Sequence, residues 1–342
     1  MFRRFSIMIV MAIFATGIAN ASETDITGFV DASLFYDDNS GDATFGLDQI
    51  EVDVVRSLSD VATIRADLEW VKDGDGWAQD LEQGYLEWLP AFAPDLSLTF
   101  GKFNAPMGFE LLDPHEMYQF SHALVFDYGL PTNLTGAMTR HPLGERFAVS
   151  GWLVNGWDSN ELSDGKPETF GGRLDASLGC RGALGVSAIS GKEWCHAGVP
   201  VGDPAYFASY EFDRTVIDFD ATLTPAPGWT LGGELNLGTY EDDAVKADWT
   251  GLMVMAHYDV NGWFGLTGRY DRFDDPDGHV FGAGVAETRT ALTIAPTFVL
   301  GDGVGALLEL RLDGSDLDAW TDADGNPTDS NLGIAFETTS TF

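Results

Sequence analysis

The feature that most constrains this chain is a two-residue alternation of apolar and polar side chains that recurs about every dozen residues. In residues 61–72 every second side chain is apolar, and the positions between them carry Arg65, Asp67 and Glu69. Residues 303–313 repeat the pattern. Such alternation predicts β-strands with one apolar and one polar face. No apolar run reaches the ~20 residues that a transmembrane helix needs. We therefore expect an all-β protein.

Sixteen such segments can be placed along the chain, although fourteen to eighteen strands fit the same pattern. They cover residues 24–36, 43–57, 61–72, 80–89, 96–104, 132–141, 146–156, 167–178, 183–192, 213–223, 229–241, 248–260, 263–273, 286–299, 304–313 and 331–342. A soluble sandwich would show the same alternation, because it also has one buried and one solvated face on each sheet. The alternation alone therefore leaves sandwich and barrel open.

The connections between these segments decide between the two architectures. Those that follow even-numbered segments are short and turn-like, as at Asn261-Gly262, whereas the others are mostly longer and acidic. The second group covers residues 37–42, 73–79, 105–131, 157–166, 193–212, 242–247, 274–285 and 314–330. Outer-membrane barrels have short periplasmic turns and longer extracellular loops. We therefore predict a transmembrane antiparallel β-barrel of about sixteen strands, with short periplasmic turns and longer acidic extracellular loops.

Both ends of the chain support export to the bacterial outer membrane. Arg3 and Arg4 precede the apolar stretch 5–18, and Ala19-Asn20-Ala21 offers a cleavage site. We expect residues 1–21 to be a cleaved signal peptide and residues 22–342 to form one barrel domain. An uncleaved membrane anchor is less compatible with so short an apolar stretch. The last segment ends in Phe342, which resembles the signal that outer-membrane assembly machinery recognises.

Aromatic residues on the predicted strands give a partial check on this placement. Trp88, Trp229 and Phe342 fall on the apolar faces near the predicted inner rim. Outer-membrane barrels carry such girdles at the level of the lipid headgroups. Trp249 and Trp263 fall out of phase with the girdle. The expected surroundings are thus outer-membrane lipid and lipopolysaccharide.

Acidic residues dominate the predicted outer loops. The chain has a net charge of −36, and these loops hold 25 Asp and Glu residues against Lys166 and Lys246 alone. The field of such a mouth concentrates cations and repels anions. An organism that keeps all its protein surfaces acidic would give the same composition. Either reading opposes nucleic-acid binding and a phosphate-selective pore, which needs rings of Lys or Arg.

A family resemblance appears in the middle of the chain. Residues 101–110, Gly-Lys-Phe-Asn-Ala-Pro-Met-Gly-Phe-Glu, followed by Leu112-Asp113-Pro114, resemble a segment of the putative β-barrel porin-2, OmpL-like family. Residues 120–126, 154–158 and 169–174 are also similar to that family. The resemblance covers about residues 80–175. It implies an outer-membrane channel and brings no catalytic residues.

The longest connection, residues 105–131, contains several acidic groups and neither Lys nor Arg. By analogy with general porins, it would fold into the barrel and narrow it. Its constriction candidates are Glu110, Asp113, His115, Glu116 and Asp127. The charged pore-lining candidates on the strands are Arg65, Asp67, Glu69, Arg173, Asp175, Arg269, Asp271, Glu309 and Arg311. An extracellular lid with solvated carboxylates remains an equal alternative for this connection.

The two cysteines, Cys180 and Cys195, are not expected to pair. The predicted topology puts Cys180 in a periplasmic turn and Cys195 in an outer loop, one strand or roughly 30 Å apart. A disulfide requires its two Cα atoms to lie within ~7 Å. Residues 179–212 are the least certain part of the strand register, so whether the two thiols pair stays open.

Metal-binding and catalytic motifs are weak in this sequence. Asp322, Asp324 and Asn326 place oxygen ligands at alternate positions, as calcium loops do, but the bidentate Glu of an EF-hand is missing. A solvated acidic loop explains the same residues. The six histidines show no paired metal spacing, and no Gly-x-Ser-x-Gly elbow is present. We expect no enzyme and no cofactor, with calcium as the one weak candidate.

The sequence thus predicts a porin that passes small hydrophilic solutes or ions by diffusion, with a preference for cations. Barrels of sixteen strands leave an aqueous channel. The alternative is a closed barrel that acts as a surface binding or adhesion protein through acidic loops that bind calcium. A homotrimer and a monomer remain equally open.

Overall fold

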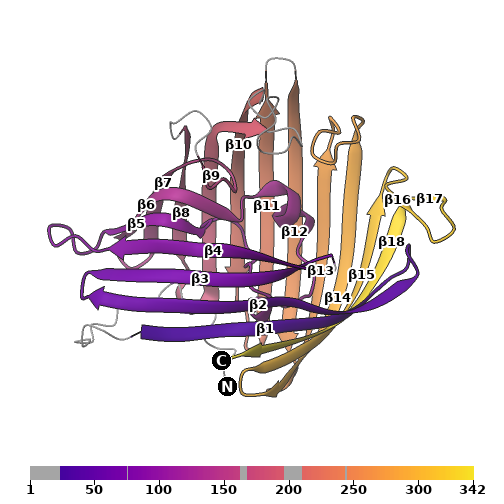
Figure 1. Cartoon of the computed structure of the whole chain (residues 1–342), viewed down its shortest axis with the longest axis horizontal. Coiled ribbons are helices and arrows are strands. Elements are labelled where there is room, and N and C mark those ends of the chain that lie inside the picture. The colour runs from indigo at the N-terminus through magenta and orange to yellow at the C-terminus, as the bar shows by residue number, and fades with distance from the viewer. Residues whose placement is uncertain (1–23, 75, 162–167, 196–209, 243–244) are drawn as a thin grey trace.

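Strand β1 (Thr24–Asp37) pairs on one side with β2 (Asp42–Ser59) and on the other with β18 (Ser330–Thr341). This pairing closes an antiparallel sheet of sixteen strands into a barrel in the computed structural model (Figure 1). The structure describes residues 24–74, 76–161, 168–195, 210–242 and 245–342. The expected signal peptide, residues 1–21, lies outside the described residues.

Each remaining barrel strand pairs with its neighbours along the chain. They are β3 (Ala62–Asp73), β4 (Gly76–Trp88), β5 (Ser97–Asn104), β6 (Asn133–Leu143), β7 (Phe147–Val154), β8 (Thr169–Ser177), β9 (Gly182–Cys195), β10 (Tyr210–Leu223), β11 (Trp229–Glu241), β12 (Lys246–Asp259), β13 (Phe264–Asp275), β14 (Glu287–Gly301) and β15 (Val304–Ser315). Two short strands, β16 (Trp320–Thr321) and β17 (Pro327–Thr328), form a separate hairpin. The predicted fold class, a closed antiparallel barrel of sixteen strands, is confirmed.

Two of the expected outer connections are shorter than predicted. Asp73 pairs with Gly76, so β3 and β4 meet in a tight turn instead of the loop expected over 73–79. Gly74 adopts a φ of 57° there, a left-handed conformation that favours glycine. Likewise, β9 continues to Cys195, which pairs with Tyr210, although a loop was expected from residue 193. In both cases the backbone hydrogen bonds of the sheet extend the strand beyond the residues that alternate between apolar and polar in the sequence.

Apolar side chains cover the outside of the barrel, and polar ones alternate inward. On β15, Leu308 and Leu310 are exposed, whereas Glu309 between them is only 4% exposed. Trp249, which was out of phase, faces inward because its indole N–H donates to Asn236 Oδ1 at 2.9 Å. Trp263 lies exposed at the turn between β12 and β13.

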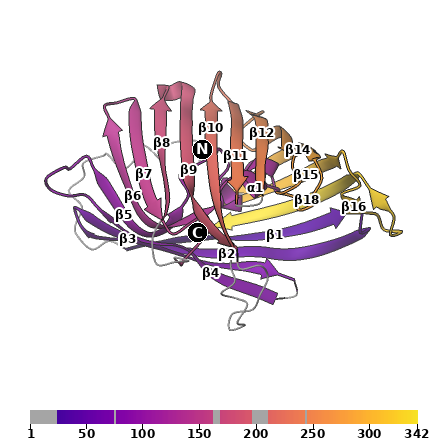
Figure 2. The same cartoon turned by 90° about the horizontal axis from the view of Figure 1, so that it is seen from above.

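Residues 105–132 form the long connection between β5 and β6, and they lie against the inner wall of the barrel. The connection contains a 3-10 turn, η3 (Pro114–Glu116), and one helical turn, α1 (Leu124–Gly129). The η3 turn contacts β1 and β18, whereas α1 contacts β11 to β14. Figure 2 shows α1 beside β11 and β12. Another 3-10 turn, η4 (Gly179–Arg181), precedes β9. None of the helices within the described ranges is long and apolar enough to cross a membrane.

Candidate functional site

A buried arginine on β13 fixes the segment 105–131 inside the barrel. The guanidinium of Arg269 donates to Glu110 Oε1 at 2.7 Å and to Asp271 Oδ2 at 3.0 Å. It also donates to the carbonyl oxygens of Ser121 at 2.6 Å and His122 at 2.9 Å. Arg269 is only 1% exposed. One inward-facing side chain therefore holds the segment at both Glu110 and residues 121–122.

The ionisation of Glu110 reflects this anchoring. Burial raises the pKa of its carboxyl group, but the charge of Arg269, a contact from His122 and the N–H of Ala123 outweigh burial. The pKa of Glu110 therefore lies below its ordinary value of 4.5. The His122 Nδ1 atom lies 3.4 Å from Glu110 Oε2, and the Ala123 N–H donates to the same oxygen at 2.7 Å. Glu110 is thus an ionised anchor.

Inward carboxylates of the barrel wall also accept hydrogen bonds from the segment's backbone. Glu234 Oε2 accepts from the N–H of Phe109 at 2.7 Å, and Asp218 Oδ1 accepts from the N–H of Gly108 at 3.3 Å. Gly108 adopts a φ of 78°, and a side chain at this position would press against the Leu130 side chain. A turn at this point therefore requires glycine, and the turn brings the backbone donors to the wall.

Strand β15, two strands from β13 in the barrel, holds the segment in the same manner. Glu309 Oε2 on β15 accepts hydrogen bonds from the N–H groups of Phe120 at 2.9 Å and Ser121 at 3.2 Å. Arg311 of the same strand donates to the His122 carbonyl at 2.6 Å. The pore-lining candidates Glu309 and Arg311 therefore both contact the segment 105–131.

The helical turn α1 packs against apolar side chains of the barrel wall. Val125 is fully buried and clusters with Ala123, Met253 and Met255. Met253 and Met255 come from β12 and face inward. This cluster removes apolar side chains of the segment from water, so that packing adds to the polar anchoring.

The other ionisable groups of the segment lie in the interior as well. Burial raises the pKa of Asp113 to about 8, aided by the carboxylates of Glu82 and Glu116. Burial also raises the pKa of Glu116 and Asp127, and it lowers the pKa of His115. These directions follow from protein atoms that replace part of the water around each group, and the Asp127 side chain still keeps an exposed surface.

Inward-facing arginines along the barrel wall are paired with carboxylates. The shortest distance between each guanidinium and its carboxylate partner is between 2.6 and 2.8 Å. The pairs are Arg65–Asp67, Arg140–Asp175, Arg173–Asp220, Arg269–Glu110, Arg289–Glu287 and Arg311–Asp313. Arg173 also contacts Asp175 at 2.6 Å. The arginine charge of the wall is thus neutralised by nearby acids.

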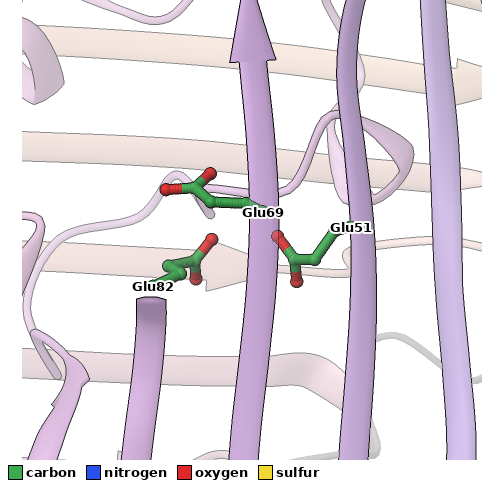
Figure 3. Close-up of side chains that lie close together, drawn as sticks. All are labelled: Glu51, Glu69 and Glu82. Carbon is green, nitrogen blue, oxygen red and sulfur yellow. The ribbon is translucent and has the colours of Figure 1, made fainter. Parts of the chain in front are cut away.

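Three glutamates form a cluster on the same part of the wall as the Arg65–Asp67 pair of β3. Glu51 of β2, Glu69 of β3 and Glu82 of β4 lie with carboxylate oxygens within 4.8 Å of one another (Figure 3). The sequence prediction included Glu69 but missed Glu51 and Glu82. Glu51 alternates with apolar Ile50 and Val52, which was a usable signal.

A β-bulge explains why Glu82 points inward. Asp67 pairs with Gln83 and Leu68 pairs with Leu81, so Glu82 is an extra residue on β4. The bulge reverses the alternation, and both Glu82 and Gln83 are buried on the inner face. A simple two-residue period would have placed Glu82 in the lipid-facing strip.

Cavities lie on both sides of the segment 105–131. One of about 400 Å³ is lined by the segment and by Arg140, Arg173, Asp175 and Asp220 on the wall. Another of about 630 Å³ lies at the short-turn end, between the turns after β12 and β14. The adjacent residues His115 and Glu116 line the second and the first cavity, respectively. The segment thus borders both cavities.

The remaining sequence candidates lie outside this region. Asp322 accepts hydrogen bonds from the N–H groups of Asp324 at 3.0 Å and Asn326 at 2.7 Å, which lowers its pKa. These three residues form the exposed turn between β16 and β17. Phe342 is exposed beside the end of β18, and its N–H donates to the Gly28 carbonyl at 3.0 Å.

The cysteines lie at opposite ends of one strand. Cys180 is a free, exposed thiol in η4, and Cys195 is the last residue of β9. A strand of this length separates them by roughly 40 Å at ~3.3 Å per residue. This places the two residues as the sequence argument expected, although Cys195 ends a strand rather than lying in a loop.

Comparison with known proteins identifies a family and several similar folds. The family model of the putative beta-barrel porin-2, OmpL-like proteins matches residues 42–342. The fold is similar to an anion-selective porin from Comamonas acidovorans (TM-score 0.69, 14% identity, 94% of this chain and 100% of that chain). It is also similar to the outer-membrane-expressed OmpT of Vibrio cholerae (0.67, 13%, 96% and 100%). A third is the outer-membrane channel DcaP of Acinetobacter baumannii (0.66, 11%, 96% and 100%). No curated protein sequence matches the chain significantly.

Proposed function

Because the chain belongs to the putative beta-barrel porin-2, OmpL-like family and is an outer-membrane porin, we propose that it conducts small hydrophilic solutes with a preference for cations. The segment 105–131 is the proposed constriction, with Glu110, Asp113, His115, Glu116 and Asp127 as its ionisable groups. The pore-lining candidates are proposed to set the charge of the remaining wall.

The observation that carries the cation preference is an imbalance of inward charge. The inward arginines of the six pairs above each have a carboxylate partner, whereas many inward carboxylates have no Lys or Arg nitrogen within 4.0 Å among the described residues. These carboxylates belong to Asp31, Glu51, Glu69, Glu82, Glu116, Asp127, Asp218, Glu234, Glu309 and Glu337. A narrow passage with surplus negative charge favours cations.

The similar fold of an anion-selective porin does not oppose this proposal. At 14% identity that likeness concerns the fold alone. Selectivity depends on the side chains that line the passage, and these are set by each sequence. The acidic predicted outer loops support the same preference, since they add negative charge at the entrance.

Solute permeation tests the channel itself. Purified full-length protein in liposomes should admit small neutral sugars, measured by osmotic swelling, at rates that fall as the sugar grows. Planar bilayers with the same protein should show discrete conductance steps. Liposomes that do not swell and bilayers without steps would refute the proposal.

A second candidate is a closed barrel that binds ligands or surfaces through its acidic outer loops. The exposed acidic turn at Asp322, Asp324 and Asn326 is the feature that favours it. Calcium binding that Asp322→Asn abolishes, without any conductance, would support this candidate over the channel. Neither candidate includes a catalytic step, and we propose that the protein is a channel rather than an enzyme.

The proposed partners follow from the location in the outer membrane. The exposed apolar side chains of the barrel contact lipid and lipopolysaccharide, and Phe342 with the last strand engages the assembly machinery. Whether three copies associate is tested by the oligomeric mass of the folded protein in mild detergent.

A further inference from the structure

At two positions an acidic residue of β2 lies directly opposite an acidic residue of β3, and only one of these two pairs has a positively charged partner. Asp53 pairs directly with Asp67, and Glu51 pairs directly with Glu69. Like charges directly opposite on neighbouring strands destabilise a sheet. Arg65 compensates the first pair, with its guanidinium 2.8 Å from Asp67 and 3.8 Å from Asp53.

The second pair has no such compensation. Within the described residues, no Lys or Arg nitrogen lies within 4.0 Å of the carboxylates of Glu51, Glu69 or Glu82. The nearby Lys102 instead binds Asp80 at 2.9 Å. The bulge on β4 brings Glu82 to this pair as a third carboxylate. The wall therefore concentrates three carboxylates at one point without a direct ion-pair partner among the described residues.

One oxygen of this cluster is buried and has no partner. Glu51 is 0% exposed, and its Oε1 atom accepts no hydrogen bond. Its carboxyl group points toward Glu69 and Glu82 (Figure 3). A buried acceptor without a donor is costly, and native proteins rarely leave one without a reason. A ligand between the three carboxylates would satisfy it.

Neighbouring amides hold the carboxylates in place. The amide nitrogen of Gln49 donates to Glu69 Oε2 at 3.0 Å and lies 3.3 Å from Glu51 Oε2. The amide nitrogen of Asn104 donates to Glu82 Oε1 at 2.7 Å. Amide donors of this kind orient carboxylate ligands around metal ions in proteins.

The spacing of the oxygens fits one hard divalent cation. Ca²⁺ binds oxygen ligands at about 2.3–2.6 Å, so two of its ligands are at most about 4.6–5.2 Å apart. Mg²⁺ needs near-ideal octahedral geometry and usually keeps several waters, so a cage of three protein carboxylates suits it less well. The three oxygens lie within 4.8 Å of one another, and all are carboxylates. We propose that Glu51, Glu69 and Glu82 form a calcium site on the inner wall of the barrel.

Binding at this site does not require conduction, so its test is separate from that of the channel. Full-length protein, folded in a non-ionic detergent and freed of metal with a chelator, is titrated with CaCl₂ in a calorimeter at pH 7.5. A parallel titration uses MgCl₂. We expect one site per chain that binds Ca²⁺ at least tenfold more tightly than Mg²⁺.

Substitutions locate the site. Glu51→Gln and Glu69→Gln should each weaken that Ca²⁺ binding at least tenfold. Because Glu69 is partly exposed, its substitution should disturb folding less than that of the fully buried Glu51, so the second variant tests the site even if the first does not fold. Glu337→Gln, another buried inward carboxylate, and Asp322→Asn, in the exposed acidic turn, should leave it unchanged. Equal binding by all variants, tighter binding of Mg²⁺, or no binding by the wild type would overturn the assignment.

Discussion

Replacing Arg269 by methionine removes the guanidinium that ties the segment 105–131 to β13. Methionine keeps the length of the side chain but offers no donor. Glu110 and Asp271 then lose their cation, and the carbonyl oxygens of Ser121 and His122 lose a charged donor. In a fraction of the molecules the segment 105–131 should therefore detach from the inner wall of the barrel.

The magnitude follows from burial of these groups. The side chains of Arg269 and Asp271 are 0% exposed, and that of Glu110 is 3% exposed. Breaking a buried ion pair by removing one partner costs about 3–5 kcal/mol. Protonation of the unpaired Glu110 limits this cost, because a carboxyl group with an ordinary pKa of 4.5 takes up a proton at pH 7 for about 3.4 kcal/mol. We therefore expect the free energy of unfolding to fall by about 3–5 kcal/mol.

Equilibrium unfolding by urea in lipid vesicles, followed by tryptophan fluorescence, measures this loss. The matched control is Arg272→Met on the same strand, because the Arg272 side chain is 45% exposed and its pair with Asp274 should contribute about 0–1 kcal/mol. Single-channel records should show a larger and noisier conductance for Arg269→Met alone. Identical unfolding energies and conductances for the two variants would refute the anchoring role.

Three further predictions concern other parts of the molecule. Because the folded pKa of Glu110 lies below 4.5, its stabilising contribution is complete above that pH and is lost as the pH falls through the folded value. The difference in urea midpoint between the wild type and Glu110→Gln should therefore be constant from pH 7 to about 5 and shrink at lower pH; a difference that grows below pH 5 would contradict this. Leu308→Lys, in the apolar belt near the middle of β15, should cost about 2–4 kcal/mol, and Leu312→Lys nearer the rim about 0–1 kcal/mol; equal costs would argue against a lipid-facing strip. Cys180 should react with a thiol reagent without prior reduction, and protection of Cys180 until a reductant is added would contradict its separation from Cys195.

The barrel could be predicted from the sequence because its physical cause is local. Each strand displays its own two-residue period, and lipid on one side with a polar interior on the other imposes that period everywhere. The order of short and long connections then fixes the antiparallel neighbours. Sequence could not locate the ends of β4 or β9, because ladder hydrogen bonds continue there through residues that do not alternate.

The interior was harder to predict because it depends on contacts between distant residues. Glu110 and Arg269 were both candidates, but only the folded barrel brings them together. Glu82 shows a different difficulty. Leu81 and Leu86 both face outward although they are five positions apart. Residues on one face of a regular strand are an even number of positions apart, so this odd spacing indicates a bulge between the two leucines. The spacing does not show which residue the bulge turns inward.

The sign of ion selectivity tests the central claim most directly. Full-length protein in a planar bilayer, with KCl tenfold more concentrated on one side, gives a reversal potential that reports which ion passes more easily. The surplus of inward carboxylates predicts a reversal potential shifted toward the potassium equilibrium potential. A shift toward the chloride equilibrium potential, or a bilayer that shows no channels, would contradict the account.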